Sequence, residues 1–135
     1  YGYIAHNFYL FAGPDDGRIR WIPFDLNLIL GGAAQSDVQL DRRDTPPYWT
    51  LIRWLIDDPV YGPRYKAAMA RASAPGGPVE PARLAASLAR WKPVVGPAVA
   101  RETSTKAFEG GYAALLETIW TRGARVDAYV VSPSI

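Results

Sequence analysis

The chain has 135 residues, of which 49% are hydrophobic and 13% aromatic. That is enough apolar material for one domain and excludes a disordered or collagen-like chain. The 15 Lys and Arg residues exceed the 13 Asp and Glu by two, and so small and scattered an excess argues against binding to nucleic acid. Cysteine is absent, which excludes disulfides, thiolate zinc sites and cysteine nucleophiles. No apolar run reaches the roughly 18 residues that a membrane span needs.

The chain begins at Tyr1, within an aromatic strand-like pattern, rather than at Met. We therefore interpret it as part of a longer protein whose N-terminus, with any signal peptide, lies upstream. On this interpretation, apolar surface should be exposed where the missing part docks, and binding of an apolar dye would detect it.

Two runs typical of β-strands come first, at 6–11 and 18–24. The glycines, proline and aspartates of 13–17 between them are typical of a turn, so the pattern predicts a β-hairpin. Because Pro23 has no N–H to donate, strand pairing should end there. Residues 24–27 should then leave the hairpin as a loop.

Apolar residues at helical spacing predict the later elements. Asp58 and Pro59 are typical of an N-cap and the first position of a helix, and Pro93 and Pro97 should interrupt the chain after the third helix. The predicted helices are 48–56, 58–72, 80–91 and 106–129. The last should bury Phe108, Tyr112, Leu115, Leu116, Ile119, Val126 and Val130.

These elements predict an α+β fold, a β-hairpin followed by a mainly helical lobe, in a single partial domain. Its three parts are the hairpin with a metal-binding loop (1–32), an exposed polar loop (33–47) and a helical region (48–135).

Oxygen-bearing side chains gather around the predicted hairpin. Asp25 and Asn27 lie two apart, and in an extended segment such residues point to the same side, where their oxygens suit a hard cation such as Mg²⁺. A turn centred on the Pro-Asp pair would place Asn7 opposite Ile22, about 10 Å of extended chain from Asp25. Asn7 and Asp25 would then share a site. An Asn before a hairpin and an Asp after it also hold the metal ions of protein kinases.

The runs that carry these residues resemble the CotH kinase family, the spore-coat protein kinases. The family pattern is a His-Asn-Tyr-Tyr-Leu-Tyr strand followed by Pro-Trp-Asp-Tyr-Asn or Pro-Trp-Asp-Leu-Asp. The matching runs here are His6-Asn7-Phe8-Tyr9-Leu10-Phe11 and Ile22-Pro23-Phe24-Asp25-Leu26-Asn27-Leu28. The later segments Asp58-Pro59-Val60-Tyr61 and Ala107-Phe108 also resemble the family's helices, so the resemblance spans most of the chain.

The resemblance implies a protein-kinase-like fold that transfers the γ-phosphate of ATP, with Mg²⁺, to Ser or Thr hydroxyls of proteins. It implies a secreted, cell-surface or spore-surface location and a coat or secreted protein as substrate. By the same resemblance, Asp25 is a catalytic residue that holds the metal, and Asn7 binds the nucleotide and a metal. Asn27, at the motif's second acidic position, is a third metal ligand, although its neutral amide offers less charge. His6 is the further catalytic candidate.

The sequence departs from the family pattern at the base that accepts the substrate's hydroxyl proton. In the family this aspartate lies shortly before the His-Asn strand, and residues 1–5 contain no Asp. The nucleotide-clamping lysine would also lie upstream, because Lys66, Lys92 and Lys106 sit in helical surface contexts instead. We therefore expect this segment by itself to be catalytically inactive.

Purely structural interpretations of the same residues stay open as alternatives to these catalytic and binding roles. His6 is also explained as a structural hydrogen-bonding group, and Asp25 as a residue that caps a turn. The strand aromatics, Trp91 and Trp120 are most simply core residues rather than a base-stacking platform. The Asp-Arg-Arg-Asp run at 41–44 is a self-neutralising loop by default, and a phosphate contact is its alternative.

Two other functions compete with the kinase. One is a non-catalytic relative that keeps the fold as a coat or surface protein-interaction module, which loss of the upstream aspartate and lysine would favour. The other is a Mg²⁺-dependent hydrolase that uses the same carboxylate, because oxygen ligands alone do not choose between water and protein as the acceptor.

Overall fold

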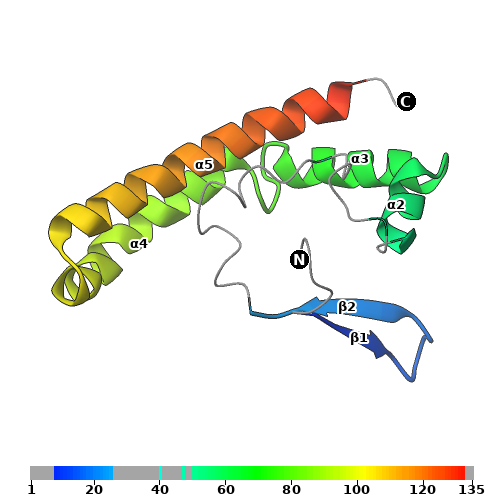
Figure 1. The fold of residues 1–135 in the computed structure, drawn as a ribbon, viewed down its shortest axis with the longest axis horizontal. Coiled ribbons are helices and arrows are strands. Elements are labelled where there is room, and N and C mark those ends of the chain that lie inside the picture. The colour runs from blue at the N-terminus through cyan, green and yellow to red at the C-terminus, as the bar shows by residue number, and fades with distance from the viewer. Residues whose placement is uncertain (1–7, 26–39, 41–46, 48–49, 133–135) are drawn as a thin grey trace.

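A computed structural model describes residues 8–25, 40, 47 and 50–132. In this part of the chain, a two-stranded hairpin is followed by four helices (Figure 1). The arrangement confirms the predicted α+β class, a hairpin followed by a mainly helical lobe. Of the predicted exposed loop, only Leu40 and Pro47 belong to the described residues.

The hairpin consists of β1 (Phe8–Ala12) and β2 (Ile19–Pro23), which pair in antiparallel orientation. Strand β2 ends at Pro23, as its missing N–H predicts. The register pairs Tyr9 with Ile22. The predicted pairing of Asn7 with Ile22 is therefore wrong by two residues.

The connection between the strands explains this register. The Asp16 carboxylate accepts a hydrogen bond from the Arg18 N–H at 3.0 Å and forms an ion pair with the Arg20 guanidinium at 2.7 Å. Gly17 adopts a φ of 63°, which costs glycine little because it has no Cβ. With these contacts, the turn is centred between Asp15 and Asp16, one residue later than the predicted centre between Pro14 and Asp15.

Both faces of the hairpin are apolar. Because side chains alternate along a strand, one face carries Phe8, Leu10, Ala12, Ile19, Trp21 and Pro23, and the other carries Tyr9, Phe11, Arg20 and Ile22. Ile19 is 71% exposed and Leu10 is 64% exposed. Large apolar side chains are thus exposed on both faces of the hairpin.

Helices α2 (Thr50–Asp57) and α3 (Tyr61–Ser73) follow in the chain. The Asp58 carboxylate accepts hydrogen bonds from the N–H groups of Val60 at 2.8 Å and Tyr61 at 2.9 Å. These are the bonds of an N-cap residue, so Asp58 does the capping that the sequence predicts. Regular α3 geometry begins at Tyr61, three residues after Asp58.

We expect Asp58→Ala to lower the free energy of unfolding by about 1 kcal/mol, because two N–H groups at the start of α3 lose their acceptor. Asp57→Ala is the matched control. Its carboxylate makes only a loose, exposed ion pair with Arg53 at 3.8 Å, so the change should stay below about 0.5 kcal/mol. Urea denaturation measures both variants, and equal effects would contradict the cap.

Helices α4 (Pro81–Glu102) and α5 (Thr105–Val131) are the two longest. The predicted end of the third helix near Trp91 is wrong, because α4 continues through Pro93 and Pro97. Both prolines are exposed, so water can reach the carbonyls that lose a helical partner. Packing against α5 supports the helix across the two breaks.

The two long helices run side by side in opposite directions (Figure 1). Gly96 of α4 lies against the Phe108 ring, where an added Cβ would stand 2.9 Å from Phe108 Cε1. The Lys92 Nζ forms an ion pair with Glu109 at 2.6 Å and lies 4.3 Å from the centroid of the Tyr112 ring. Because Gly96 has no side chain, the backbones of α4 and α5 can approach each other closely there. The contacts of Lys92 with Glu109 and Tyr112 hold the two helices in this alignment.

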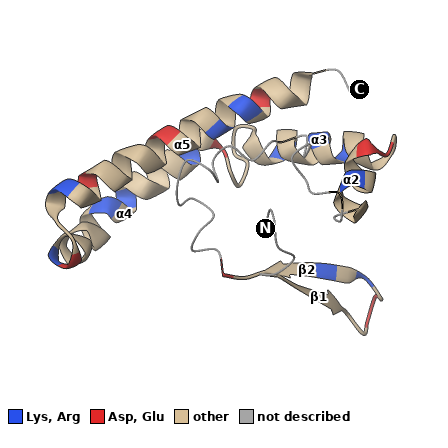
Figure 2. Cartoon of the chain, viewed as in Figure 1, with Lys and Arg blue, Asp and Glu red and all other residues tan. Residues whose placement is uncertain are grey.

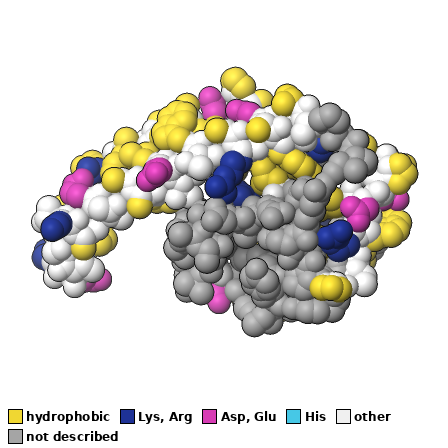
Figure 3. Space-filling view, turned by 45° about the horizontal axis from the view of Figure 1, so that its top comes forward, with side chains coloured by type: hydrophobic (Ala, Val, Ile, Leu, Met, Phe, Trp, Pro, Cys, Tyr) yellow, Lys and Arg dark blue, Asp and Glu magenta, His cyan; other side chains and the backbone are white. Residues whose placement is uncertain are grey.

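The residues predicted to be buried along α5 are half-buried rather than fully buried. No hydrophobic side chain in the described ranges is fully buried. Trp91 and Trp120, expected to anchor the core, are 52% and 53% exposed, so that expectation is wrong for both. Figure 3 shows hydrophobic side chains on the outward surface of the helices.

Acidic and basic side chains are mixed along α4 and α5 (Figure 2). Over the described residues, no helix combines the length and apolar character needed to cross a bilayer.

We expect the folded protein to bind an apolar dye through the hairpin. Ile19→Thr should lower the dye fluorescence, because it removes apolar surface from the face that also carries Leu10 and Trp21. Val131→Thr is the matched control, since Val131 is 82% exposed at the far end of the helical region. An equal decrease in both variants would exclude the hairpin as the main dye site.

Candidate functional site

Of the four residues predicted to form the site, Asp25 is the one that the structure describes. His6, Asn7 and Asn27 lie outside the described residues. The Asp-Arg-Arg-Asp run at 41–44 lies outside them as well.

Asp25 is an exposed residue that follows β2 after Phe24. Its φ is 53°, the left-handed region that few residues other than glycine adopt, although Asp and Asn tolerate it best. The chain thus leaves the strand direction at Asp25. Its carboxylate stands at the point where the hairpin ends.

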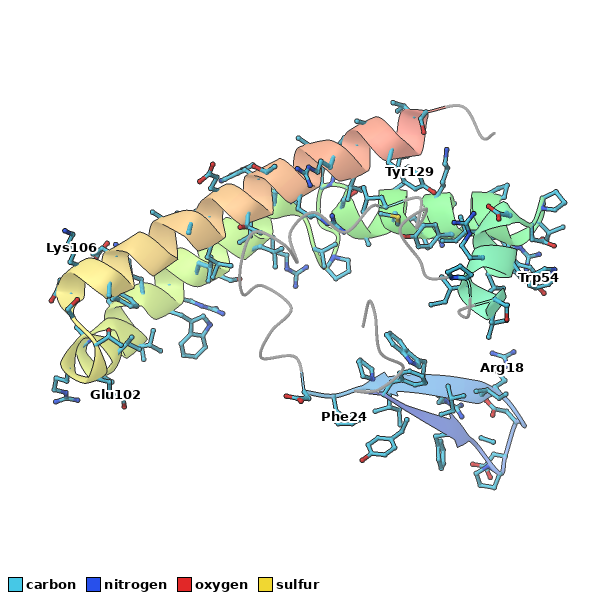
Figure 4. All side chains as sticks on the ribbon, viewed as in Figure 1. Arg18, Phe24, Trp54, Glu102, Lys106 and Tyr129 are labelled. Atoms are coloured by element: carbon cyan, nitrogen blue, oxygen red, sulfur yellow. The ribbon has the colours of Figure 1, made fainter. Side chains whose placement is uncertain are left out.

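Aromatic contacts fix the backbone just before Asp25. The Phe24 ring stacks on the Tyr9 ring of β1, with centroids 4.8 Å apart and planes at 21°. On the other face, Phe8 and Trp21 lie 5.8 Å apart across the two strands. Figure 4 shows Phe24 at the open end of the hairpin and Arg18 at the turn end. Asp25 therefore extends from the end at which both strands are held by ring contacts.

The register bears on the predicted ligand pair. Phe8, which follows Asn7 in the chain, pairs with Pro23, two residues before Asp25. The residue after Asn7 is thus paired, at the open end, with a residue two positions before Asp25. Convergence of Asn7, Asn27 and Asp25 on one ion stays a prediction.

The chemistry of Asp25 fits a magnesium ion. Mg²⁺ is usually held by one or two carboxylates and completes its shell with water and substrate phosphates. In the described part of the chain, no three His, Cys, Asp or Glu residues come together as a metal-binding group. An ion at Asp25 would therefore depend on amide, water or phosphate oxygens for its other ligands.

The three lysines belong to helices, as the sequence predicts. Lys66 in α3 donates to the Ser132 carbonyl at 2.8 Å, and Lys92 in α4 pairs with Glu109. Lys106 lies at the start of α5, far from Phe24 in Figure 4. The contacts of Lys66 and Lys92 are structural rather than those of a phosphate clamp.

A cavity of about 220 Å³ lies between α3, α4 and α5, which the sequence did not suggest. Its lining is apolar except for Ser73, Thr118 and Arg122. The Ser73 hydroxyl donates to the Met69 carbonyl at 3.0 Å, and the Thr118 hydroxyl to a carbonyl of its own helix at 2.9 Å. The two hydroxyls thus serve the helix backbone, and the cavity does not resemble a catalytic centre.

Sequence reasoning also missed the role of Tyr65. The Tyr65 hydroxyl donates a hydrogen bond to the Leu40 carbonyl at 3.1 Å, across 25 positions of sequence. No local pattern signals such a contact.

A family model described as CotH kinase protein matches residues 2–122. The matched region includes the hairpin, Asp25 and most of the helical region, and it ends within α5. No curated protein and no solved structure matches the chain.

Proposed function

The chain belongs to the CotH kinase protein family, and on this premise we propose that it forms part of a protein kinase that uses Mg²⁺-ATP to phosphorylate Ser or Thr of a protein. The observation that carries this proposal is the position of Asp25. An exposed carboxylate stands at the open end of the hairpin, inside the matched region.

In the proposed site, Asp25, Asn7 and Asn27 hold Mg²⁺, and Asn7 also contacts the nucleotide. Bound Mg²⁺ would supply charge neutralisation to the phosphate oxygens of ATP. The stack of Phe24 on Tyr9 supports the role of Asp25, because a carboxylate on a fixed backbone need not be reorganised when the nucleotide binds. His6 is a further catalytic candidate.

In the proposed phosphoryl transfer, the hydroxyl oxygen of the substrate bonds to the γ-phosphorus of ATP. The bond from that phosphorus to its bridging oxygen breaks, and ADP leaves with the electron pair. The hydroxyl proton passes to a base. Because residues 1–5 contain no aspartate, we propose that residues 1–135 by themselves are catalytically inactive.

The second candidate function is a non-catalytic coat or surface module of the same family. The exposed apolar faces of the hairpin favour it, because large exposed apolar patches mark surfaces that bind other proteins. Under either function we propose a secreted, cell-surface or spore-surface location.

Calorimetric titration of Mg²⁺-ATP into the full-length protein tests the proposal. Binding that requires both Mg²⁺ and Asp25 supports a kinase site. A folded protein that binds no nucleotide overturns it and leaves the interaction module. If nucleotide binds, phosphate released without a protein acceptor would identify a hydrolase instead.

A further inference from the structure

The cavity between the helices has the size of a single ring. Its volume is about 220 Å³, and α3, α4, α5 and the connection between α3 and α4 all contribute to its lining. An apolar cavity of about 150 Å³ is already large enough to bind benzene, whereas pockets for drug-sized ligands begin at roughly 300 Å³. The space therefore suits a small molecule. The apolar side chains that line it include those of Met69, Ala72, Val79, Leu84, Ile119 and Val126.

The hydroxyl groups of the lining donate within their own helices. The Ser73 hydroxyl donates to the Met69 carbonyl at 3.0 Å, and the Thr118 hydroxyl donates to the Ala114 carbonyl at 2.9 Å. Arg122 is half-buried, and an arginine lines apolar space through its long aliphatic stem. A ligand rich in hydroxyl groups would give up hydrogen bonds to water that these two hydroxyls do not replace as donors. The lining therefore favours a neutral apolar ligand.

Hydrogen bonds hold the entrance in place. Val79 lines the cavity and is 50% exposed, so we place the entrance beside this residue. Its N–H donates to the Ala72 carbonyl at 3.0 Å, and the Gly76 N–H donates to the Glu80 carboxylate at 2.8 Å. The Arg83 guanidinium donates to the Gly76 carbonyl at 3.3 Å. A ligand would thus enter a preformed site and would not have to order the chain around it.

Two small residues leave the space unfilled. Ala72 of α3 and Gly123 of α5 both line the cavity. Gly123 is buried against Pro81, and a Cβ added there would overlap the proline ring. This contact fixes α4 and α5 beside the cavity, so the helices cannot close the space by moving together there. Because an unfilled apolar space forfeits packing contacts, an apolar ligand that fills it would restore them.

Met69 narrows the ligand class further. It is the single methionine of the chain, and it lies half-buried in the cavity wall. A thioether side chain is unbranched and polarizable, so it adapts its shape to a bound molecule, and its sulfur makes favourable contacts with aromatic rings. We propose that the cavity is a binding site for a small neutral aromatic molecule. The site contains no residue of the hairpin, and the proposal does not rest on the kinase function.

Calorimetric titration of the full-length protein with benzene tests the proposal. We expect the wild type to bind benzene and Ala72→Leu to lose this binding, because the larger side chain fills the cavity. Ala68→Leu is the matched control, since it makes the same substitution at an exposed position of α3, and it should bind as the wild type does. A folded wild type that does not bind benzene overturns the proposal. So does equal binding by the two leucine variants, because benzene would then bind elsewhere.

Met69→Leu is a second test, which conserves side-chain volume and should therefore keep the fold even if Ala72→Leu does not. We expect it to weaken benzene binding about two- to tenfold, the range that corresponds to a contact between sulfur and an aromatic ring. Binding of cyclohexane, which has the same number of carbon atoms but no aromatic face, should stay unchanged. Equal effects on the two compounds, or no effect on benzene, would overturn the aromatic site.

Discussion

Replacing Asp25 by Asn is expected to weaken Mg²⁺-dependent ATP binding by at least about 100-fold. Loss of a residue that only supports a metal ligand typically costs 10- to 100-fold in affinity, and a carboxylate that binds the ion directly should cost at least as much. The choice of Asn follows from the backbone. At a φ of 53°, Asn is tolerated, whereas Ala would add strain and confuse lost charge with lost structure.

Asp15→Asn is the control for this experiment. It makes the same substitution in the turn at the other end of the hairpin, where Asp15 is exposed. Calorimetry should show nucleotide binding in the control and not in Asp25→Asn, with equal melting temperatures for both. If a folded Asp25→Asn protein binds as the wild type does, Asp25 is a turn residue and the proposed metal site is wrong.

Gly96→Leu is expected to lower the free energy of unfolding by about 2–3 kcal/mol, the upper part of the range for overpacking a close contact. Gly96 is buried, and a Cβ there would lie 2.9 Å from Phe108 Cε1 and 3.2 Å from its Cζ. A leucine must push α4 away from α5 or displace the Phe108 ring. Either response weakens the contact between the two longest helices.

Gly110→Leu is the matched control in the neighbouring helix. Nothing lies within 4 Å of a Cβ at Gly110, so this substitution should raise the stability by about 0.5–1 kcal/mol through helix propensity alone. Urea denaturation should thus give opposite signs for the same substitution at the two glycines. Equal signs would contradict the close approach of α4 and α5 at Gly96.

Local chemistry by itself determined much of this fold. Pro23 ends its strand because it has no N–H, and Asp58 caps α3 because its carboxylate reaches the first free N–H groups of the helix. The pattern around Asp25 also led from the sequence to the family that the comparison identifies. Each of these features depends on residues within a few positions of one another.

Tertiary contacts decided the rest. Helix α4 continues past Pro93 and Pro97 because α5 packs along it. The hydrogen bond from Tyr65 to Leu40 joins residues 25 positions apart. Short-range patterns predict most ends of the strands and helices, but contacts between distant residues form only once the elements are packed, so only the folded structure reveals them.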